Sequence, residues 1–198
     1  MKIGFTGAGG TGKTTTLNIL SEMYPDIPVL PSNTRSVYNK WNITEVDQET
    51  MTFQDKLRLQ EDIYAVRVEA ENKCDRGFLS DRTILDNFCY QQVRCYEAMD
   101  HPMFMEKRKL IKENMRQYDF ICYFPITFAP VGDDVRYGNP VFQNLMDNLM
   151  FAELHKLDLW KKVLTVGAGS PEDRAHKIMK LVETLSEPPF QHRLMLGS

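Results

Sequence analysis

The most constraining feature of this sequence is a glycine-rich turn between a short apolar run and the start of a helix. Residues 2–6 read KIGFT, residues 7–14 read GAGGTGKT, and residues 15–20 read TTLNIL. The turn fits the pattern G-x-x-x-x-G-K-[ST] in the strand–loop–helix context that this pattern requires. Glycines let the backbone curl so that several N–H groups point inward, and the helix N-terminus adds its dipole. The segment therefore predicts a cradle for a polyphosphate.

Each polar group of this turn has an expected role. The Lys13 ammonium would reach the β- and γ-phosphates of a bound triphosphate, and the Thr14 hydroxyl would ligate Mg²⁺. The alternative is a plain glycine-rich turn that opens a helix. The residues expected to contact the nucleotide in this turn are Gly7, Ala8, Gly9, Gly10, Thr11, Gly12, Lys13, Thr14 and Thr15.

The length, composition and charge of the chain favour one globular domain and argue against a membrane-spanning protein or one attracted to nucleic acid by its overall charge. A chain of 198 residues with 42% hydrophobic and 26% charged residues is typical of one globular domain. The net charge of −3 gives no overall attraction to nucleic acid or to an anionic membrane. We expect no membrane span and no signal peptide, because no apolar run is long enough and a strand pattern starts at the second residue. The four cysteines lack metal-site spacing and are expected to be reduced thiols of a cytoplasmic protein.

Strand and helix patterns alternate along the chain, which predicts a parallel sheet with crossover helices. Strand patterns cover residues 2–6, 29–30, 78–80, 120–124 and 163–166. Helical patterns cover residues 13–23, 48–73, 83–98, 103–117 and 140–156, and a last one begins at 171. Residues 31–46 and 125–140 read as loops. We expect a single domain over residues 1–186 and a tail without regular structure over 187–198.

An acidic residue and an arginine follow the strand at residues 78–80 directly. Ligands of open α/β sheets bind at the carboxyl ends of strands, so Asp81 should face the phosphates at the end of the first strand. It would hold Mg²⁺ through water or take a proton from an attacking hydroxyl, while Arg82 would hold a phosphate oxygen. The alternative is a structural ion pair at a helix start.

Two loops carry further candidates. The segment over residues 125–140 is long enough to be a functional lid, and Arg136 in it is a candidate to neutralise charge during phosphoryl transfer. An ordinary solvated arginine explains the residue equally well. The segment over residues 166–170 (VGAGS) consists of small residues, so Gly167 would allow a flat ring to come close. A plain helix-capping loop is the alternative.

The long helix and the segment before it predict contacts with a second substrate. Gln60 and Arg67 are seven residues apart and border an apolar stripe, so a base edge could pair with the amide and a phosphate with the guanidinium. Arg35 is a candidate for an acceptor phosphate, and Tyr38 or Trp41 could stack on a base. Helix-edge polar residues without a ligand are the alternative.

These features together resemble the P-loop nucleoside and nucleotide kinases, especially the nicotinamide-riboside-kinase-like and thymidylate-kinase-like ATPases, many of them viral. The resemblance covers residues 1–186 and implies a three-layer α/β fold with five parallel strands in the order 2-3-1-4-5. It implies ATP and Mg²⁺ as cofactors, adenine near residues 167–170, and a host cytoplasmic location for a viral protein. The residues given roles by the resemblance are Lys13, Thr14, Asp81, Arg82 and Arg136. One departure is the absence of Glu or Asp at the end of the second strand, where deoxynucleoside kinases usually carry their base.

We therefore expect a kinase that transfers the γ-phosphoryl group of ATP to a nucleoside or a nucleoside monophosphate, as a monomer or a homodimer. A kinase that acts on a polynucleotide or on a modified base in DNA is the main alternative, because residues 105–116 carry five basic side chains against two acidic ones. An oligomeric ATPase, a GTPase switch and a binding module without catalysis are the others. The GTPase alternative depends on residues 72–75, which read NKCD and match the guanine-binding pattern N-K-x-D.

Overall fold

The computed structural model describes residues 1–98, 102–128 and 139–186 and has one parallel sheet at its centre. Its strands are β1 (Lys2–Thr6), β2 (Val29–Leu30), β3 (Phe78–Asp81), β4 (Phe120–Tyr123) and β5 (Val163–Thr165). Their order across the sheet is β2-β3-β1-β4-β5, and every neighbouring pair is parallel. The predicted strand order is therefore confirmed.

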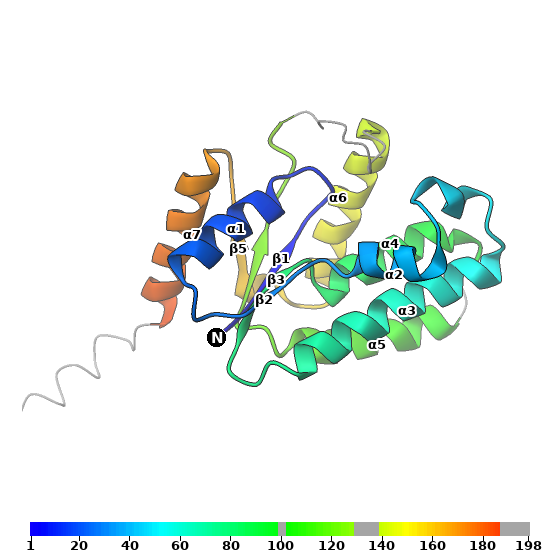
Figure 1. The fold of residues 1–198 in the computed structure, drawn as a ribbon, viewed down its shortest axis with the longest axis horizontal. Coiled ribbons are helices and arrows are strands. Elements are labelled where there is room, and N and C mark those ends of the chain that lie inside the picture. Colours follow the sequence, from blue (N-terminus) through cyan, green and yellow to red (C-terminus); the bar gives the residue numbers. More distant parts are fainter. Residues whose placement is uncertain (99–101, 129–138, 187–198) are drawn as a thin grey trace, which may run out of the picture.

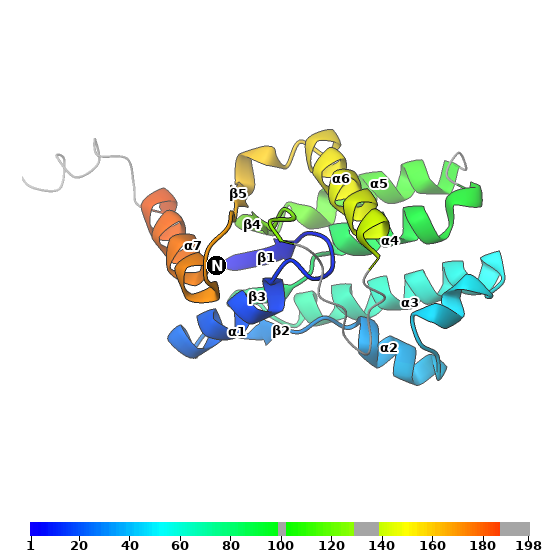
Figure 2. The same ribbon diagram turned by 90° about the horizontal axis from the view of Figure 1, so that it is seen from above.

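Helices cover both faces of the sheet, as predicted (Figures 1 and 2). The helices are α1 (Lys13–Met23), α2 (Thr34–Trp41), α3 (Phe53–Asn72), α4 (Ile84–Arg94), α5 (Pro102–Met115), α6 (Pro140–Lys156) and α7 (Pro171–Ser186). Short 3₁₀ segments lie at Val46–Glu49, Tyr96–Ala98 and Trp160–Lys162. Helices α1 and α7 lie side by side on one face, and α3 to α6 cover the other (Figure 2). In the part of the chain that the structure describes, none of these helices combines the length and apolar character that a bilayer crossing requires.

Two predictions of local structure are wrong: one misses a helix, and the other begins a helix too early. Residues 31–46 were expected to form a loop, yet they contain α2, whose Val37 is buried against Leu59 and Ile63 of α3. That helix depends on a tertiary contact, which its polar sequence does not reveal. The helix expected from residue 48 begins at residue 53, because the Thr52 side chain accepts a hydrogen bond from the Asp55 amide and so caps it.

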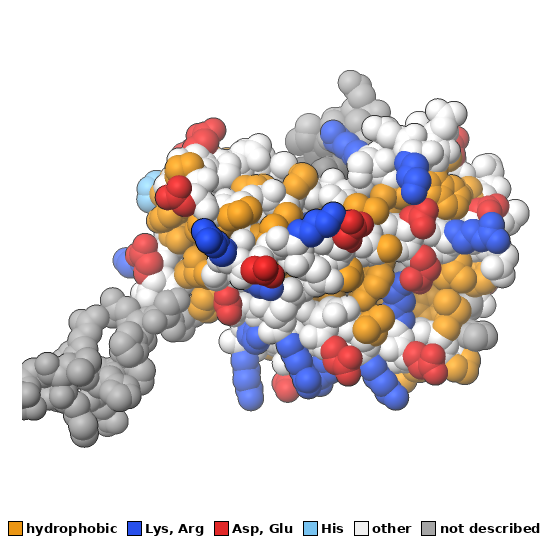
Figure 3. Space-filling model, turned by 60° about the horizontal axis from the view of Figure 1, so that its bottom comes forward, with side chains coloured by type: hydrophobic (Ala, Val, Ile, Leu, Met, Phe, Trp, Pro, Cys, Tyr) orange, Lys and Arg blue, Asp and Glu red, His pale blue; other side chains and the backbone are white. Residues whose placement is uncertain are grey.

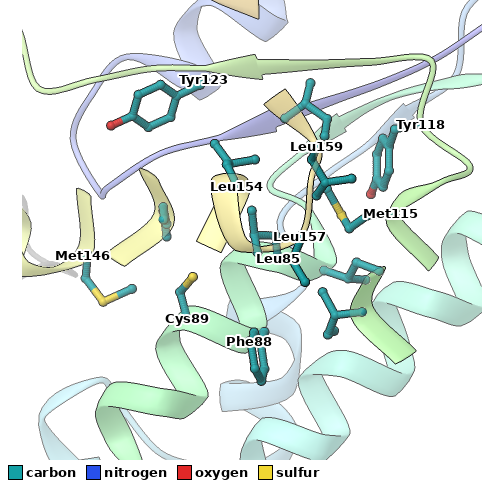
Figure 4. Packing of buried hydrophobic residues seen from close by; sticks show 14 of the residues in the cluster. Leu85, Phe88, Cys89, Met115, Tyr118, Tyr123, Met146, Leu154, Leu157 and Leu159 are labelled. Carbon is teal, nitrogen blue, oxygen red and sulfur yellow. The ribbon is translucent and has the colours of Figure 1, made fainter. Parts of the chain in front are cut away.

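The larger core lies between the sheet and helices α3 to α6, and its packing is shown in Figure 4. Side chains from strands, helix ends and connecting turns fill this space. The labelled members are Leu85, Phe88, Cys89, Met115, Tyr118, Tyr123, Met146, Leu154, Leu157 and Leu159. A second core joins α1 and α7 to the opposite face of the sheet. Burial of apolar surface on both faces stabilises the sheet, and so fixes the carboxyl ends of its strands relative to one another.

A buried arginine ties the long helix to these strand ends. Arg67 of α3 is 2% exposed, and its Nη1 donates to the Ser80 hydroxyl at 2.9 Å. Its Nη2 donates to the carbonyl oxygens of Pro31 and Asp81, each at 2.9 Å. The guanidinium therefore links the end of β3 to the residue that follows β2, and it holds the backbone of Asp81 in place.

We expect Arg67→Met to lower the free energy of unfolding by about 3 kcal/mol or more, because two buried acceptors, on Ser80 and Asp81, and the Pro31 carbonyl lose a charged donor. Urea denaturation measures this. Arg58→Met is the matched control, since Arg58 lies on the same helix and is exposed; its change should stay within about 0.5 kcal/mol. Equal effects of the two substitutions would show that Arg67 does not hold the strand ends.

Candidate active site

The glycine-rich loop joins the carboxyl end of β1 to the N-terminus of α1. A Cβ added to Gly7 would lie 2.5 Å from the Phe124 carbonyl oxygen, so only glycine permits this close approach. Gly12 caps α1 with a φ of 85°, and its carbonyl accepts from the Thr16 amide at 3.1 Å. The first amides of α1 therefore point out of the helix toward the loop.

The Lys13 side chain folds back over this loop. Its ammonium donates to the Ala8 carbonyl at 2.5 Å and to the Thr11 hydroxyl at 3.1 Å. The Thr11 hydroxyl in turn donates to the Ala8 carbonyl at 3.1 Å. Lys13 is only 5% exposed, so its positive charge is held within the loop rather than in bulk solvent. A positive charge at this position, beside helix-terminal amides, suits a polyphosphate.

A threonine and a carboxylate meet beside the loop. The Thr14 hydroxyl donates to Asp81 Oδ2 at 2.8 Å. Asp81 is the last residue of β3 and pairs in register with Phe5 of β1, which brings it beside the loop. Hydroxyl and carboxylate oxygens are hard ligands of the kind that Mg²⁺ takes. Within the described residues there is no cluster of three or more acidic, histidine or cysteine side chains that could hold a metal ion by themselves.

Arg82 has a strained backbone and a fixed side chain. Its φ is 77°, a left-handed value that is uncommon outside glycine, and the Ser80 hydroxyl donates to its carbonyl at 2.7 Å. The guanidinium lies 3.3 Å from Asp86 Oδ1 and 5.0 Å from the centre of the Tyr90 ring. Burial alone would lower the pKa of Arg82, but Tyr90, Asp86 and Asp81 outweigh burial and raise it. A permanent, immobilised positive charge results.

Two cavities meet at these residues. The smaller, of about 240 Å³, is bounded by loop residues 10–15 and Phe128, and we name it the phosphate cavity. The larger, of about 380 Å³, extends between α2, α3, α4 and α6, and we name it the acceptor cavity. The residues that line both cavities are Gly10, Thr14, Asp81 and Arg82. A volume of 380 Å³ lies in the range of small-molecule sites.

The far part of the acceptor cavity presents an ordered polar network. Gln60 is 3% exposed, and its Nε2 donates to Gln48 Oε1 at 3.4 Å. Gln48 Nε2 donates to the Tyr38 hydroxyl at 2.6 Å. Burial, assisted by Glu45, raises the pKa of Tyr38 to about 12, so the phenol stays protonated. Gln60 Oε1 is buried and has no hydrogen-bond partner within the described chain, and an unpaired buried acceptor requires an explanation.

The structure brings together most, though not all, of the residues predicted from sequence. Arg35 and Gln60 line the acceptor cavity together with Asp81 and Arg82. Arg67 does not line either cavity, because its guanidinium is occupied by Ser80 and by backbone carbonyls. The segment that begins at Gly167 follows β5 and lines neither cavity. Arg136 lies outside the described residues, as does most of the predicted lid.

Several residues of the site were missed in the sequence. Asp86 and Tyr90 follow Arg82 at intervals of four, so the first turns of α4 carry them on one face toward the acceptor cavity. That spacing was visible in the sequence. Gln143, on the first turn of α6, donates to the Gly9 carbonyl at 2.7 Å and lines the same cavity. Phe128 lies beside the phosphate cavity, and no spacing pattern indicated it.

Two sequence features that favoured other functions lie away from this site. Residues 72–75, which match the guanine-binding pattern, are at the end of α3 and lead into the amino end of β3, opposite the loop edge of the sheet. Lys73 there pairs with Glu69 at 2.6 Å. On the basic helix α5, Lys107 pairs with Glu61, and Arg108 Nη2 lies 2.8 Å from Glu153 Oε1. The face shown in Figure 3 has acidic and basic side chains interspersed.

A comparison with protein-family models gave a match that covers most of this chain. A model of the AAA domain family matches residues 2–174. The search of curated proteins gave no match.

Several solved structures share the fold. Deoxyadenosine kinase from M. mycoides with bound dATP has a TM-score of 0.68 and 13% identity, over 92% of this chain and 100% of that chain. Thymidylate kinase from Candida albicans has a TM-score of 0.63 and 15% identity, over 92% of this chain and 90% of that chain. NadR in complex with NAD and AMP-PNP has a TM-score of 0.63 and 18% identity, over 91% of this chain and 48% of that chain, so this chain spans about half of NadR.

We expect Gly12→Ala to destabilise the protein by about 2 kcal/mol, because its Cβ would adopt a left-handed φ and lie 2.7 Å from the Arg174 Nη1 atom. Gly167→Ala is the matched control, since no atom of the described residues lies within 4 Å of its Cβ position, and its effect should be within about 0.5 kcal/mol. Chemical denaturation of both variants measures the difference. Equal stabilities would contradict the loop geometry described above.

Proposed function

The chain belongs to the AAA domain family, and from that premise we propose that it is an ATP- and Mg²⁺-dependent kinase whose acceptor is a nucleoside or a nucleoside monophosphate. The observation that carries this proposal is the junction of the two cavities at Thr14, Asp81 and Arg82. A phosphoryl group held at the end of the loop would face a hydroxyl bound in the acceptor cavity. Both reactants would then be oriented before reaction, which is the main contribution that a protein makes to phosphoryl transfer.

In the proposed reaction, the acceptor hydroxyl oxygen forms a bond to the γ-phosphorus, and the bond to the β–γ bridging oxygen breaks so that ADP leaves. The proton of the hydroxyl goes to the Asp81 carboxylate. Lys13 and the loop amides bind the phosphates, and the fixed charge of Arg82 stabilises negative charge on the moving group. Mg²⁺, held by Thr14 and Asp81, would neutralise the phosphate oxygens.

Recognition of the acceptor is proposed to depend on Gln60 and Arg35. The unpaired Gln60 Oε1 would accept a hydrogen bond from a base N–H, and this would remove the cost of a buried acceptor without a donor. Arg35 is exposed at the rim of the cavity, where a monophosphate could reach it. Adenine nucleotides are named in the complexes of two structural relatives, which supports ATP as the donor.

Incubation of the protein with Mg²⁺, γ-labelled ATP and a panel of nucleosides, nucleoside monophosphates and DNA tests this function. Label should move to one small-molecule class, and Lys13→Ala should remove the transfer while the far-ultraviolet circular dichroism spectrum stays the same. Lys180→Ala, an exposed position on α7, is the control and should keep full activity. Transfer to DNA alone would favour a polynucleotide kinase, and full activity of Lys13→Ala would refute the role given to the loop.

Asp81→Asn should lower kcat by about 100-fold or more if the carboxylate takes the acceptor proton. In that case, raising the Mg²⁺ concentration does not restore the rate. If the carboxylate acts mainly through the metal, excess Mg²⁺ restores much of it. A variant with unchanged kcat at every Mg²⁺ concentration would reduce Asp81 to a structural residue. Steady-state kinetics across a Mg²⁺ titration distinguishes these results.

A further inference from the structure

An exposed aromatic ring stands at the rim of the phosphate cavity. Phe128 is 43% exposed and belongs to none of the buried hydrophobic clusters of the described chain. Its ring tip lies 3.8 Å from the Cβ position built on Gly12, so the ring stands beside the N-terminus of α1. Core packing therefore does not explain a large apolar side chain next to a polar anion site.

A buried arginine supports this ring. Arg174, on the first turn of α7, is 6% exposed, and its guanidinium lies 5.5 Å from the centre of the Phe128 ring. Its Nη1 donates to the Thr11 carbonyl at 3.1 Å, and its Nη2 donates to the Thr127 hydroxyl at 3.3 Å. The same side chain thus binds the glycine-rich loop, the residue before Phe128 and the ring itself. The ring position is coupled to the loop that would hold the phosphates.

We infer that Phe128 is the stacking platform for the purine base of the bound nucleotide, and that Arg174 is the residue that positions it. This inference rests on the proposed function, because it assigns the base end of a nucleotide whose phosphates lie in the loop. A base linked through its ribose to phosphates at residues 10–15 emerges at the rim of the phosphate cavity, where Phe128 lies. A flat ring there gains stacking energy against the aromatic face, and a purine covers more of that face than a pyrimidine does.

This assignment adds a residue that the sequence did not indicate. The expected base contact was Gly167, which lines neither cavity and has no atom of the described residues within 4 Å of its Cβ position. Its segment leads into α7, and the first turn of α7 carries Arg174. The β5–α7 connection would therefore contribute to base binding indirectly, by placing Arg174 against the Phe128 ring.

Calorimetry with Mg²⁺ and two ligands, ATP and inorganic tripolyphosphate, separates base binding from phosphate binding. For Phe128→Leu we expect the affinity for ATP to fall about tenfold, because stacking on a base is lost, while the affinity for tripolyphosphate changes by less than about twofold. Phe128→Tyr should bind ATP as the unaltered protein does, since it keeps the aromatic face. Phe151→Leu is the matched control, because Phe151 is 44% exposed and lies on α6 away from the phosphate cavity.

Two results would overturn the platform while leaving the proposed function in place. One is a Phe128→Leu variant that binds ATP as tightly as the unaltered protein. The other is an equal loss of ATP and tripolyphosphate affinity, which would mean that the ring only supports the loop. If the unaltered protein binds neither ligand, both the proposed function and the platform are refuted.

Discussion

The hydrogen bond between Thr14 and Asp81 is the contact on which the rest of the site depends. It joins the first turn of α1 to the carboxyl end of β3, two elements that are far apart in the sequence and adjacent only because β1 and β3 pair in parallel. A one-residue shift in that pairing would turn Asp81 toward the other face of the sheet. The position of the carboxylate beside the glycine-rich loop is thus a consequence of strand register.

Polar side chains are buried beside these strand ends, and their burial costs free energy. Arg67 donates to the backbone carbonyls of Pro31 and Asp81 and to the Ser80 hydroxyl rather than to a ligand. The Glu71 carboxylate is buried one turn further along α3. Burial raises the pKa of Glu71, although hydrogen bonding from Tyr118 and the charge of Arg67 oppose the rise. The strained φ of Arg82 is a further cost, and it aims that side chain at the boundary between the two cavities.

The sequence predicted those parts of the molecule that depend on local pattern. The phosphate loop followed from a short motif, the parallel sheet from alternating elements, and the position of Asp81 from the general placement of ligands at strand ends. The strand order was implied by the resemblance to the P-loop kinases. Helix α2 was missed because it is stabilised by Val37 packing on α3, which is a long-range contact. Periodicity placed Gln60 and Arg67 on one face but could not tell which of them faces a cavity. Only the structure shows that Gln60 Oε1 has no partner among the described residues, whereas both terminal nitrogens of Arg67 donate to protein acceptors.

A crystal structure of the protein with AMP-PNP and Mg²⁺ is the most direct test of this account. The account predicts that the triphosphate lies along residues 7–15, with the γ-phosphorus facing the acceptor cavity between Asp81 and Arg82. A nucleotide whose γ-phosphate points away from that boundary, or whose phosphates lie outside the glycine-rich loop, would contradict the central claim that two reactants meet there.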